Sequence, residues 1–447
     1  MSMGMCTVRR NVLVATIVTV FFLAICALYP HAAIAATYYV ATTGNDSDPG
    51  TLDQPFLTIF KGLTVLVAGD TLFIRGGTYT TSTNWSANVH VPSGTSWSNA
   101  ITIAAYPSEV ATIDRIAIQD NIDLSIVSYL IFDHITTPSV WFGGGAHHIR
   151  LINSDVNGTI PPYLPPDTPN YGVMLIQGNV NFFEVLNSKI HDAGYNGTTT
   201  PCFSTTVNYG CYGFYVGGHD MIFERNEIYN NSGYGINLYD TGQSGVSNNI
   251  IRNNVFYANG FHDYGRDFPL AAFIVSSGSD NLAYNNIVYN NCIGIQAFDT
   301  NGGTNNQIYN NTVYNNGTVA EGTCTIPGPG ILVNESAFVI TNNIVYGNGS
   351  AIDDYTTGAT YSNNLCASAT PHCDVVGDPQ FVNAAGNNFH LQASSAARNA
   401  GTTVSSVPTD YDGITRPQET AYDIGAYEYQ VSPSQLRVPS NLTIIIP

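Results

Sequence analysis

The stretch NNTVYNN (residues 310–316) contains four asparagines in seven residues, which is unexpected in a chain that must bury an apolar core. Related stretches recur along the sequence: RNEIYNN (225–231), RNNVFYAN (252–259), YNNIVYNN (284–291), TNNIVYGN (341–348) and, more weakly, SNNLCAS (362–368). Most of them combine asparagine with alternating apolar residues and an aromatic residue. This recurrence indicates that the fold is built from many copies of one unit.

The copies align on the second asparagine of each motif, or on the serine that replaces it. The aligned column is Ser154, Ser188, Asn226, Asn254, Asn286, Asn311, Asn343 and Asn364. Its members are separated by 34, 38, 28, 32, 25, 32 and 21 residues, which is typical of a solenoid. The residue two positions further on is apolar in every copy, from Val156 to Cys366. This alternation predicts strands, because the i, i+3, i+4 spacing of a helix is missing.

The aligned asparagine column is expected to point inward together with the apolar column, because side chains alternate along a strand. A buried amide needs hydrogen-bond partners. Asparagines stacked about 4.8 Å apart on neighbouring strands can bond to one another and to the backbone. We therefore predict an asparagine ladder with a structural role.

A second apolar stretch that begins near glycine or alanine follows in each unit: YGVMLI (171–176), YGFYVG (212–217), YGINLY (234–239), AAFIVS (271–276), IGIQAF (293–298) and PGILVN (329–334). Turns such as GGHD (217–220) then lead to a third strand and back to the asparagine motif. Three short strands per unit without a helical crossover predict an all-β fold, a single-stranded parallel β-helix of about ten rungs.

Residues 1–36 have the features of a signal peptide, because Arg9 and Arg10 precede an apolar run from Val12 to Leu28 and small residues follow. A retained membrane anchor is the alternative, since the run is near the lower limit for spanning a bilayer. Removal of this segment leaves 11 basic against 32 acidic residues, a net charge of about −21. Such a charge argues against nucleic acid and anionic membranes as partners.

Six cysteines remain after the expected signal peptide: Cys202, Cys211, Cys292, Cys324, Cys366 and Cys373. An even number in an exported chain predicts three disulfides. Sequence proximity suggests the pairs 202–211 and 366–373, which leaves 292–324, although six cysteines allow fifteen pairings. A metal cluster is not supported, because no CxxC pair supplies the spacing of a tetrahedral site.

Two further stretches carry a family resemblance. YYVATTGNDSDPGTLDQPFLTIFKGL (38–63) and GDTLFIRGGTY (69–79) resemble the N-terminal capping region of secreted β-helix proteins, including family 9 polysaccharide lyases. YDGITRPQETAYDIGAYEY (411–429) resembles a motif at the end of many bacterial surface β-helix proteins. Together with the repeat, the chain resembles the right-handed parallel β-helix, pectate-lyase-like superfamily.

This resemblance implies a right-handed solenoid with an N-terminal cap. We expect the cap and first rungs in residues 37–125, the β-helix body in 126–400, and a closing segment and tail in 401–447. A short helix around residues 56–67 would cover the unpaired strand at the N-terminal end, and Lys61 would belong to it.

Surplus length in the repeat units indicates where a ligand could bind. The insertions at 157–170, 193–211, 259–270 and 316–328 all fall between the asparagine-tyrosine strand and the glycine-led strand, so they share one corner. Long loops on a rigid solenoid often form the wall of a binding groove. Neutral loop drift is the alternative explanation.

The outward positions beside this corner carry charged and aromatic residues. Asp155, Lys189 and Glu227 are expected on consecutive rungs, with His191, Tyr229 and Tyr257 beside them. We predict Lys189, His191 and Arg266 as catalytic residues, Tyr229, Tyr257, His262 and Tyr264 as substrate-binding residues, and Asp155, Asp192, Glu227, Asp263 and Asp267 as metal ligands. The alternatives are a ladder of compensating surface charges and tyrosines that only stabilise the sheet.

The family resemblance implies β-elimination on a uronic-acid-containing polysaccharide, with lysine as the base. Lys189 is the candidate, because the chain's other lysine, Lys61, is assigned to the cap. Its acidic neighbours favour the charged ammonium form, which opposes action as a base. Ca²⁺ bound to Asp155, Asp192 or Glu227 is therefore the expected cofactor, because it would cancel their field.

Other functions stay open. Asp155 and Glu227 are expected about 9.6 Å apart, near the upper limit of about 9.5 Å for an inverting glycoside hydrolase, although Lys189 would stand between them. YGFYVGGHD (212–220) is similar to the Tyr-Gly-Phe-Asp-Pro-His-Asp stretch of alginate epimerases, but Tyr215 and Val216 replace the acid and the proline. The non-enzymatic alternative is a surface glycan-binding or structural protein. The preferred function is a secreted or cell-surface polysaccharide lyase, with the polysaccharide and the oligomeric state unspecified.

Overall fold

The computed structural model describes residues 35–80, 91–118, 126–158, 174–176, 179–194, 212–239, 245–261, 270–298, 302–320, 324, 327–336 and 338–430. The chain divides into two units, Met1–Ala36 and Thr37–Pro447. Because the described residues begin at 35, residues 1–34 of the expected signal peptide lie outside them. No helix in the described ranges is both long enough and apolar enough to cross a membrane.

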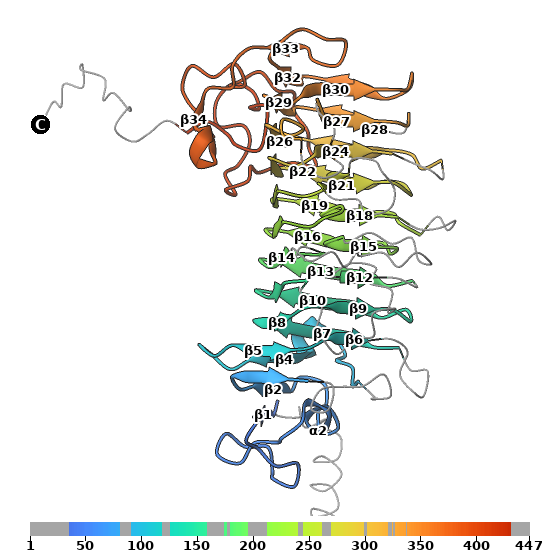
Figure 1. Ribbon diagram of the computed structural model, residues 1–447, viewed down its shortest axis with the longest axis vertical. Helices are drawn as coiled ribbons and strands as arrows, with labels where there is room; N and C mark the ends of the chain where they lie inside the picture. The colour runs from blue at the N-terminus through green and yellow to red at the C-terminus, as the bar shows by residue number, and fades with distance from the viewer. Residues whose placement is uncertain are drawn as a thin grey trace, which may run out of the picture. The chain divides into compact units, whose positions relative to one another are not determined.

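The unit that begins at Thr37 is a right-handed parallel β-helix, as predicted (Figure 1). Its described residues form three parallel sheets of 12, 12 and 9 strands, compared with about ten predicted rungs, and a small two-stranded sheet. Successive strands of each large sheet come from successive repeat units. The backbone bonds of one coil are therefore satisfied by the coils above and below it.

The strands of the three large sheets have the following bounds. Sheet A contains β1 (Thr37–Val40), β2 (Thr71–Ile74), β4 (Ile101–Ala105), β7 (Ser128–Asp133), β10 (His147–Ile152), β13 (Asn181–Leu186), β16 (Ile222–Glu224), β19 (Ile250–Arg252), β22 (Leu282–Tyr284), β25 (Asn306–Tyr309), β28 (Phe338–Thr341) and β31 (Thr360–Ser362). Sheet B contains β3 (Gly77–Tyr79), β5 (Ala111–Ile113), β8 (Ile135–Thr137), β11 (Asp155–Val156), β14 (Lys189–His191), β17 (Glu227–Tyr229), β20 (Val255–Tyr257), β23 (Ile287–Tyr289), β26 (Thr312–Tyr314), β29 (Ile344–Tyr346), β32 (Leu365–Cys366) and β33 (Val375–Val376). Sheet C contains β6 (Ile116–Ile118), β9 (Val140–Phe142), β12 (Met174–Ile176), β15 (Phe214–Val216), β18 (Ile236–Leu238), β21 (Ala271–Val275), β24 (Ile293–Ala297), β27 (Pro329–Val333) and β30 (Ser350–Asp354).

The predicted apolar column lines the interior of sheet B. Its members pair with one another in register and are at most 1 % exposed: Val156, Ile190, Ile228, Phe256, Val288, Val313, Val345 and Cys366. One core therefore runs along the coils, and every rung adds apolar area to it.

The predicted asparagine ladder is confirmed at the corner between sheets A and B. The Oδ1 atom of Asn286 accepts hydrogen bonds from both the backbone N and the Nδ2 of Asn254, each at 3.0 Å. The Nδ2 atom of Asn286 in turn donates to Asn311 and to the Ile251 carbonyl. Every polar atom of the buried amide is thereby satisfied, which is the condition for burying it.

Two further asparagine ladders were missed by the sequence alignment. One follows sheet B and contains Asn231, Asn259, Asn291, Asn316 and Asn348. The other precedes sheet A and contains Asn249, Asn281 and Asn306. The asparagines after each tyrosine in NNTVYNN and its relatives were the available signal for the first of them. All three corners of the coil are therefore reinforced by amide ladders.

The first asparagine of each Asn-Asn pair in the repeat has a different structural role. Asn253, Asn285, Asn310, Asn342 and Asn363 adopt left-handed backbone conformations with φ between 51° and 59°. Asparagine tolerates this region better than most residues, so it suits a tight turn. The double asparagine thus combines a left-handed turn residue with an inward ladder residue.

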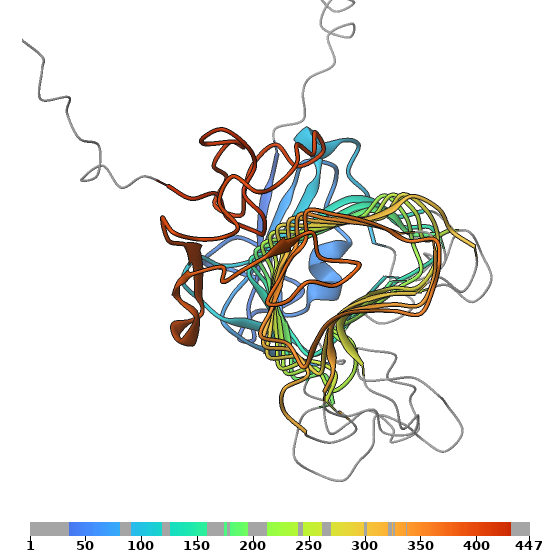
Figure 2. The same cartoon turned by 90° about the horizontal axis from the view of Figure 1, so that it is seen from above.

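The N-terminal end carries the helix α2 (Ile59–Leu63), which is shorter than the predicted segment 56–67 but includes Lys61 as expected. Thr58 caps it, since its Oγ1 accepts a hydrogen bond from the Lys61 backbone N at 3.0 Å. Ile59 and Leu63 are buried. Viewed along the solenoid, α2 lies within the outline of the coils (Figure 2).

The segment after the last coil folds back along the side of the solenoid (Figure 1). It contains β34 (Phe381–Asn383), the 3-10 helix η2 (Ala384–Gly386) and β35 (Asn388–Leu391), followed by irregular chain to residue 430. Phe389 packs on Tyr289 and Tyr314 of sheet B, with ring centroids 5.4 Å apart in both pairs. The segment 381–430 therefore covers part of the outer face of sheet B.

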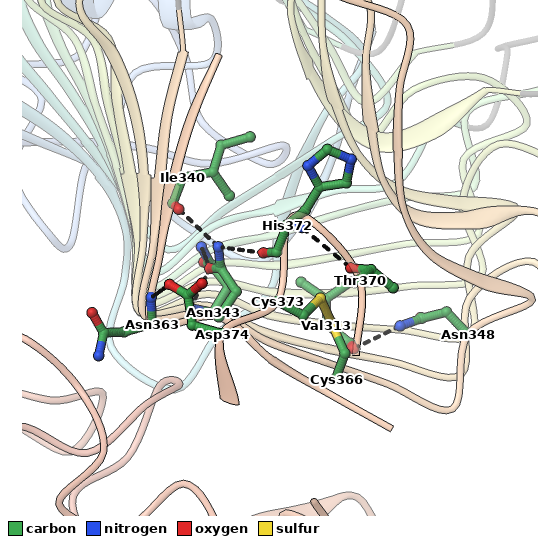
Figure 3. The surroundings of a disulfide bond; sticks show 11 residues. Val313, Ile340, Asn343, Asn348, Asn363, Cys366, Thr370, His372, Cys373 and Asp374 are labelled. Atoms are coloured by element: carbon green, nitrogen blue, oxygen red, sulfur yellow. Dashed lines mark hydrogen bonds between the residues drawn. A yellow bond between two sulfur atoms is a disulfide. The ribbon is translucent and has the colours of Figure 1, made fainter. Parts of the chain in front are cut away.

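Two of the three suggested disulfides are confirmed, Cys292–Cys324 and Cys366–Cys373. The second closes a short loop at the last coil, beside the end of the asparagine ladder, where Asn343 donates to Asn364 (Figure 3). Cys202 and Cys211 lie outside the described residues.

Candidate functional site

The charged trio stands on three adjacent strands of sheet B, as predicted. Asp155 on β11 pairs with Lys189 on β14, which pairs with Glu227 on β17. His191 pairs with Tyr229, and Tyr229 with Tyr257, two residues further along the same strands. The repeat therefore brings together residues that are 28 to 38 positions apart in the sequence.

His191 is held between two carboxylates. Its Nε2 lies 3.0 Å from Oδ1 of Asp155, and its Nδ1 lies 2.8 Å from Oδ2 of Asp192. Asp192 adopts a left-handed conformation, with φ 59°, at the end of the strand. Burial by itself lowers the pKa of His191, but the two hydrogen bonds to Asp155 and Asp192 outweigh it and raise the pKa above its ordinary value.

This arrangement defines what His191 can do. An imidazolium donates from both ring nitrogens, which matches its two carboxylate partners. Its side chain is only 13 % exposed, so neither N–H points to a ligand. In this geometry His191 orients Asp155 and Asp192, and its predicted catalytic role stays a prediction.

Lys189 is more accessible than His191. Its Nζ lies 3.7 Å from Oε2 of Glu227, and its side chain is 57 % exposed. The other oxygen of Glu227 accepts a hydrogen bond of 2.8 Å from the Tyr257 hydroxyl. Glu227 is therefore shared between a tyrosine and a loosely held lysine.

The outward tyrosines form a continuous stack with His191. Ring centroids are 4.6 Å apart for His191 and Tyr229, 4.9 Å for Tyr229 and Tyr257, and 5.4 Å for Tyr257 and Tyr289. Burial, together with nearby carboxylates, raises the pKa of Tyr229 to about 12. Both faces of Tyr229 and of Tyr257 are covered by neighbouring rings, so their edges and hydroxyls are the parts that a ligand could contact.

The predicted insertions do share one corner, since each joins a strand of sheet B to the following strand of sheet C. The loop that carries His262, Asp263, Tyr264, Arg266 and Asp267 lies outside the described residues. The predicted roles of these five residues stay predictions.

The fit of a Ca²⁺ ion can be judged from the carboxylates that the structure describes. Asp155 and Asp192 are engaged by His191, and Glu227 by Tyr257 and Lys189. No three His, Cys, Asp or Glu side chains in the described ranges are arranged to hold a metal ion. Calcium needs six to eight oxygen ligands, so the described carboxylates do not fit it in this arrangement.

The outer face of sheet C carries a cluster that sequence reasoning missed. It contains Tyr212, Tyr215, Tyr234, Leu270, Ala271, Ile274 and Ile293, all buried. The Tyr234 hydroxyl donates a hydrogen bond of 3.0 Å to Oε1 of Gln296. The tyrosines beside the glycine-led strands were the available signal for this cluster.

The fold agrees with a known family. A family model described as a right handed beta helix region matches residues 138–262 and 203–366, which together span about half of the chain. The chain belongs to this right-handed β-helix family.

Individual relatives match over parts of the chain. The pectate lyase PEL9 of Emericella nidulans is 35 % identical over 88 residues, which is 20 % of each protein. The uncharacterized protein YwoF of Bacillus subtilis is 27 % identical over 286 residues, 58 % of this chain and 57 % of that protein. The chain therefore spans about a fifth and about half of these two relatives.

Among solved structures, the pectate lyase Pel9A superposes with a TM-score of 0.56 at 18 % identity. The alignment covers 89 % of this chain and 97 % of Pel9A. At this level of identity the similarity concerns the fold, and function has to be argued from the site.

Proposed function

We propose that the protein is an exported enzyme that cleaves a uronic-acid-containing polysaccharide by β-elimination, with Lys189 as the base. The observation that carries this proposal is the state of Lys189 within its cluster. Both ring nitrogens of His191 are engaged by Asp155 and Asp192, whereas the Lys189 side chain is 57 % exposed and its Nζ lies 3.7 Å from Glu227. Lys189 has the most exposed side chain of this charged cluster, which supports its contact with an arriving sugar.

The proposed reaction needs one proton acceptor. The Lys189 amine removes the proton next to the substrate carboxylate, the electron pair forms a carbon–carbon double bond, and the adjacent carbon–oxygen bond to the leaving sugar breaks. The leaving oxygen then takes a proton from solvent water, and Lys189 later returns its proton to solvent. Glu227 lies beside Lys189, with its Oε2 3.7 Å from the lysine Nζ, and its Oε1 accepts a hydrogen bond from the Tyr257 hydroxyl.

Export is the second part of this proposal. The charged and apolar N-terminal segment supports it, and so do the two disulfides, because disulfides persist in oxidising compartments.

The test is an assay of the full chain on plant, algal and animal acidic polysaccharides, with and without EDTA. We expect ultraviolet absorbance from the unsaturated product, and its loss in both Lys189→Ala and Lys189→Arg. The arginine variant keeps the positive charge but cannot act as a base. Lys61→Ala, in the cap, is the matched control and should retain full activity. Unchanged turnover in Lys189→Arg would remove Lys189 as the base, and new reducing ends without ultraviolet absorbance would instead indicate a hydrolase.

A non-catalytic glycan-binding protein is the second candidate. The observation that favours it is the pairing of both His191 ring nitrogens with Asp155 and Asp192, which is also expected of a cluster that only stabilises the sheet. Retention on a polysaccharide without any cleavage product would support this candidate.

A further inference from the structure

A second surface feature lies at the corner where the chain enters sheet A. One turn position recurs there on seven consecutive rungs, always with a left-handed backbone and φ between 50° and 59°. In chain order its occupants are Tyr129, His148, Phe182, Asp220, Asn248, Asp280 and Asn305. The four rungs nearer the C-terminus, from Asp220 to Asn305, thus use Asp or Asn, which tolerate this conformation.

Two of the three preceding rungs carry residues that do not favour this conformation, whereas histidine at position 148 tolerates it. Tyr129 and Phe182 are the only Phe, Tyr or Trp residues with positive φ among the described residues. A bulky side chain in this region is a strained choice, and such strain is concentrated at functional sites. Two bulky exceptions, on either side of His148 at a turn that elsewhere uses Asp or Asn, point to a role beyond forming the turn.

The three rings form an ordered stack on the outside of the solenoid. Centroids are 4.5 Å apart for Tyr129 and His148, and 4.7 Å for His148 and Phe182. Trp97 packs edge-on against Tyr129 at 5.6 Å. The Arg150 guanidinium lies 3.7 Å from the Trp97 ring centroid and pairs with Glu184 through bonds of 2.6 and 3.1 Å. The group is therefore preorganised, with aromatic rings bordered by a fixed polar pair.

Phe182 ends the stack and is open to a ligand. Its residue is 45 % exposed, and the next member of the column is Asp220 rather than another ring. Tyr229 on sheet B differs, because rings cover both of its faces. Aromatic surface of this kind packs against the C–H face of a pyranose, while the Arg150–Glu184 pair offers donors and acceptors to hydroxyls.

We propose that the open face of Phe182, supported by the stacked rings of His148 and Tyr129 and bordered by Trp97 and the Arg150–Glu184 pair, forms a carbohydrate-binding platform that contacts a pyranose ring of a polysaccharide chain. The platform stands on sheet A, apart from the Lys189 site on sheet B. The proposal rests on the polysaccharide part of the proposed function but not on any cleavage. A nucleic acid strand is disfavoured by the net charge of −19 for the whole chain.

Recognition through a ring face predicts how binding depends on salt concentration. Arg150 is neutralised by Glu184, and burial together with His147 lowers the pKa of His148 below its ordinary value, which favours the neutral ring. Binding at this platform should therefore change little with ionic strength, because exposed unpaired charges are the ones that salt screens.

The column itself supplies the variants that test the proposal. Asn248 and Asn305 occupy the same position on later rungs, which shows that this turn accepts asparagine. Tyr129→Asn, His148→Asn and Phe182→Asn should therefore leave the thermal midpoint unchanged or higher. Retention on insoluble polysaccharides and in affinity electrophoresis is measured in the Lys189→Ala background, which removes turnover. We expect Phe182→Asn to weaken binding on the order of tenfold and the triple variant to abolish it.

The control is Tyr355→Asn, which removes a 74 % exposed tyrosine elsewhere and should bind as the parent does. Retained binding by the triple variant, or no binding of any polysaccharide by the parent, would overturn the platform. A large fall in the thermal midpoint of the Asn variants would also overturn it, because the stack would then be structural. Cleavage assays on the triple variant with Lys189 retained keep this result separate from the Lys189 proposal, since loss of the platform leaves the reaction itself in place.

Discussion

His191 Nε2 lies 3.0 Å from Oδ1 of Asp155, although the two residues are 36 positions apart in the sequence. The contact exists because β11 and β14 are neighbours in sheet B. With Asp192 on the other ring nitrogen, the imidazole links two rungs and fixes two carboxylates beside Lys189. The geometry of the candidate site thus depends on the register of the solenoid.

The His191 contacts predict a pH-dependent stability. The pKa of His191 is raised in the folded protein, so its stabilisation is fully present below pH 6.5, its ordinary value, and is lost as the pH rises through the folded pKa. The difference in thermal midpoint between the parent and His191→Gln should therefore be largest at acidic pH and shrink at alkaline pH. A pH-independent difference would contradict this. The variant Asp155→Asn/Asp192→Asn should show little of the effect, because it lacks the carboxylates that hold the imidazolium.

The central asparagine ladder predicts a strong dependence of stability on one amide. Asn286→Ala leaves donors of Asn254 and the Ile251 carbonyl without their partner in the buried interior. We expect a loss of about 3 kcal/mol in the free energy of unfolding, measured with urea. Asn315→Gly, at a left-handed turn position, should cost much less, because glycine adopts positive φ without strain. Equal losses in the two variants would mean that the ladder bonds contribute nothing specific.

The closing segment contains a buried ion pair, and we expect the loss of one partner to destabilise the segment more than the replacement of both. Arg416 and Glu428 are 2.8 Å apart with side chains 0 % and 1 % exposed, and Arg416 also donates to Asn285 of the solenoid. Arg416→Met should destabilise the segment by about 3–5 kcal/mol, because it leaves Glu428 buried without its partner. Faster limited proteolysis within residues 381–430 would report this loss. The double variant Arg416→Met/Glu428→Gln should regain most of the protection, and a failure to do so would show that the charges themselves hold the segment.

The two described disulfides should differ in their contribution to stability. Cys292–Cys324 closes a separation of 32 residues and Cys366–Cys373 one of 7. Loop-closure entropy then predicts losses of about 4 and about 2 kcal/mol when each pair is replaced by alanine. Denaturant titration of both variants measures the difference. The reverse order would show that local packing at the last coil outweighs chain entropy.

Much of the fold was predictable because, in a solenoid, residues that are one repeat unit apart in the sequence lie next to each other on adjacent strands. Once Asn226, Asn254 and Asn286 were aligned, the inward ladder, the apolar column and the adjacency of Asp155, Lys189 and Glu227 followed from strand alternation and register. The short cap helix was also found from its local sequence, although its bounds were overestimated.

The remaining features depend on contacts that the repeat pattern does not describe, such as those between the coils and the closing segment. Asn285 meets Arg416 across 131 residues, and Phe389 covers Tyr289, so no alignment of the repeats reveals that the closing segment hides part of the tyrosine stack. The saturation of His191 depends on the left-handed turn at Asp192, and the exposed ring of Phe182 depends on a turn conformation that its side chain disfavours. The sequence determined which residues share a rung and a face, because that information is periodic. Which of those residues are covered, paired or left open to a ligand was decided by the tertiary structure, because burial depends on distant segments that happen to pack there.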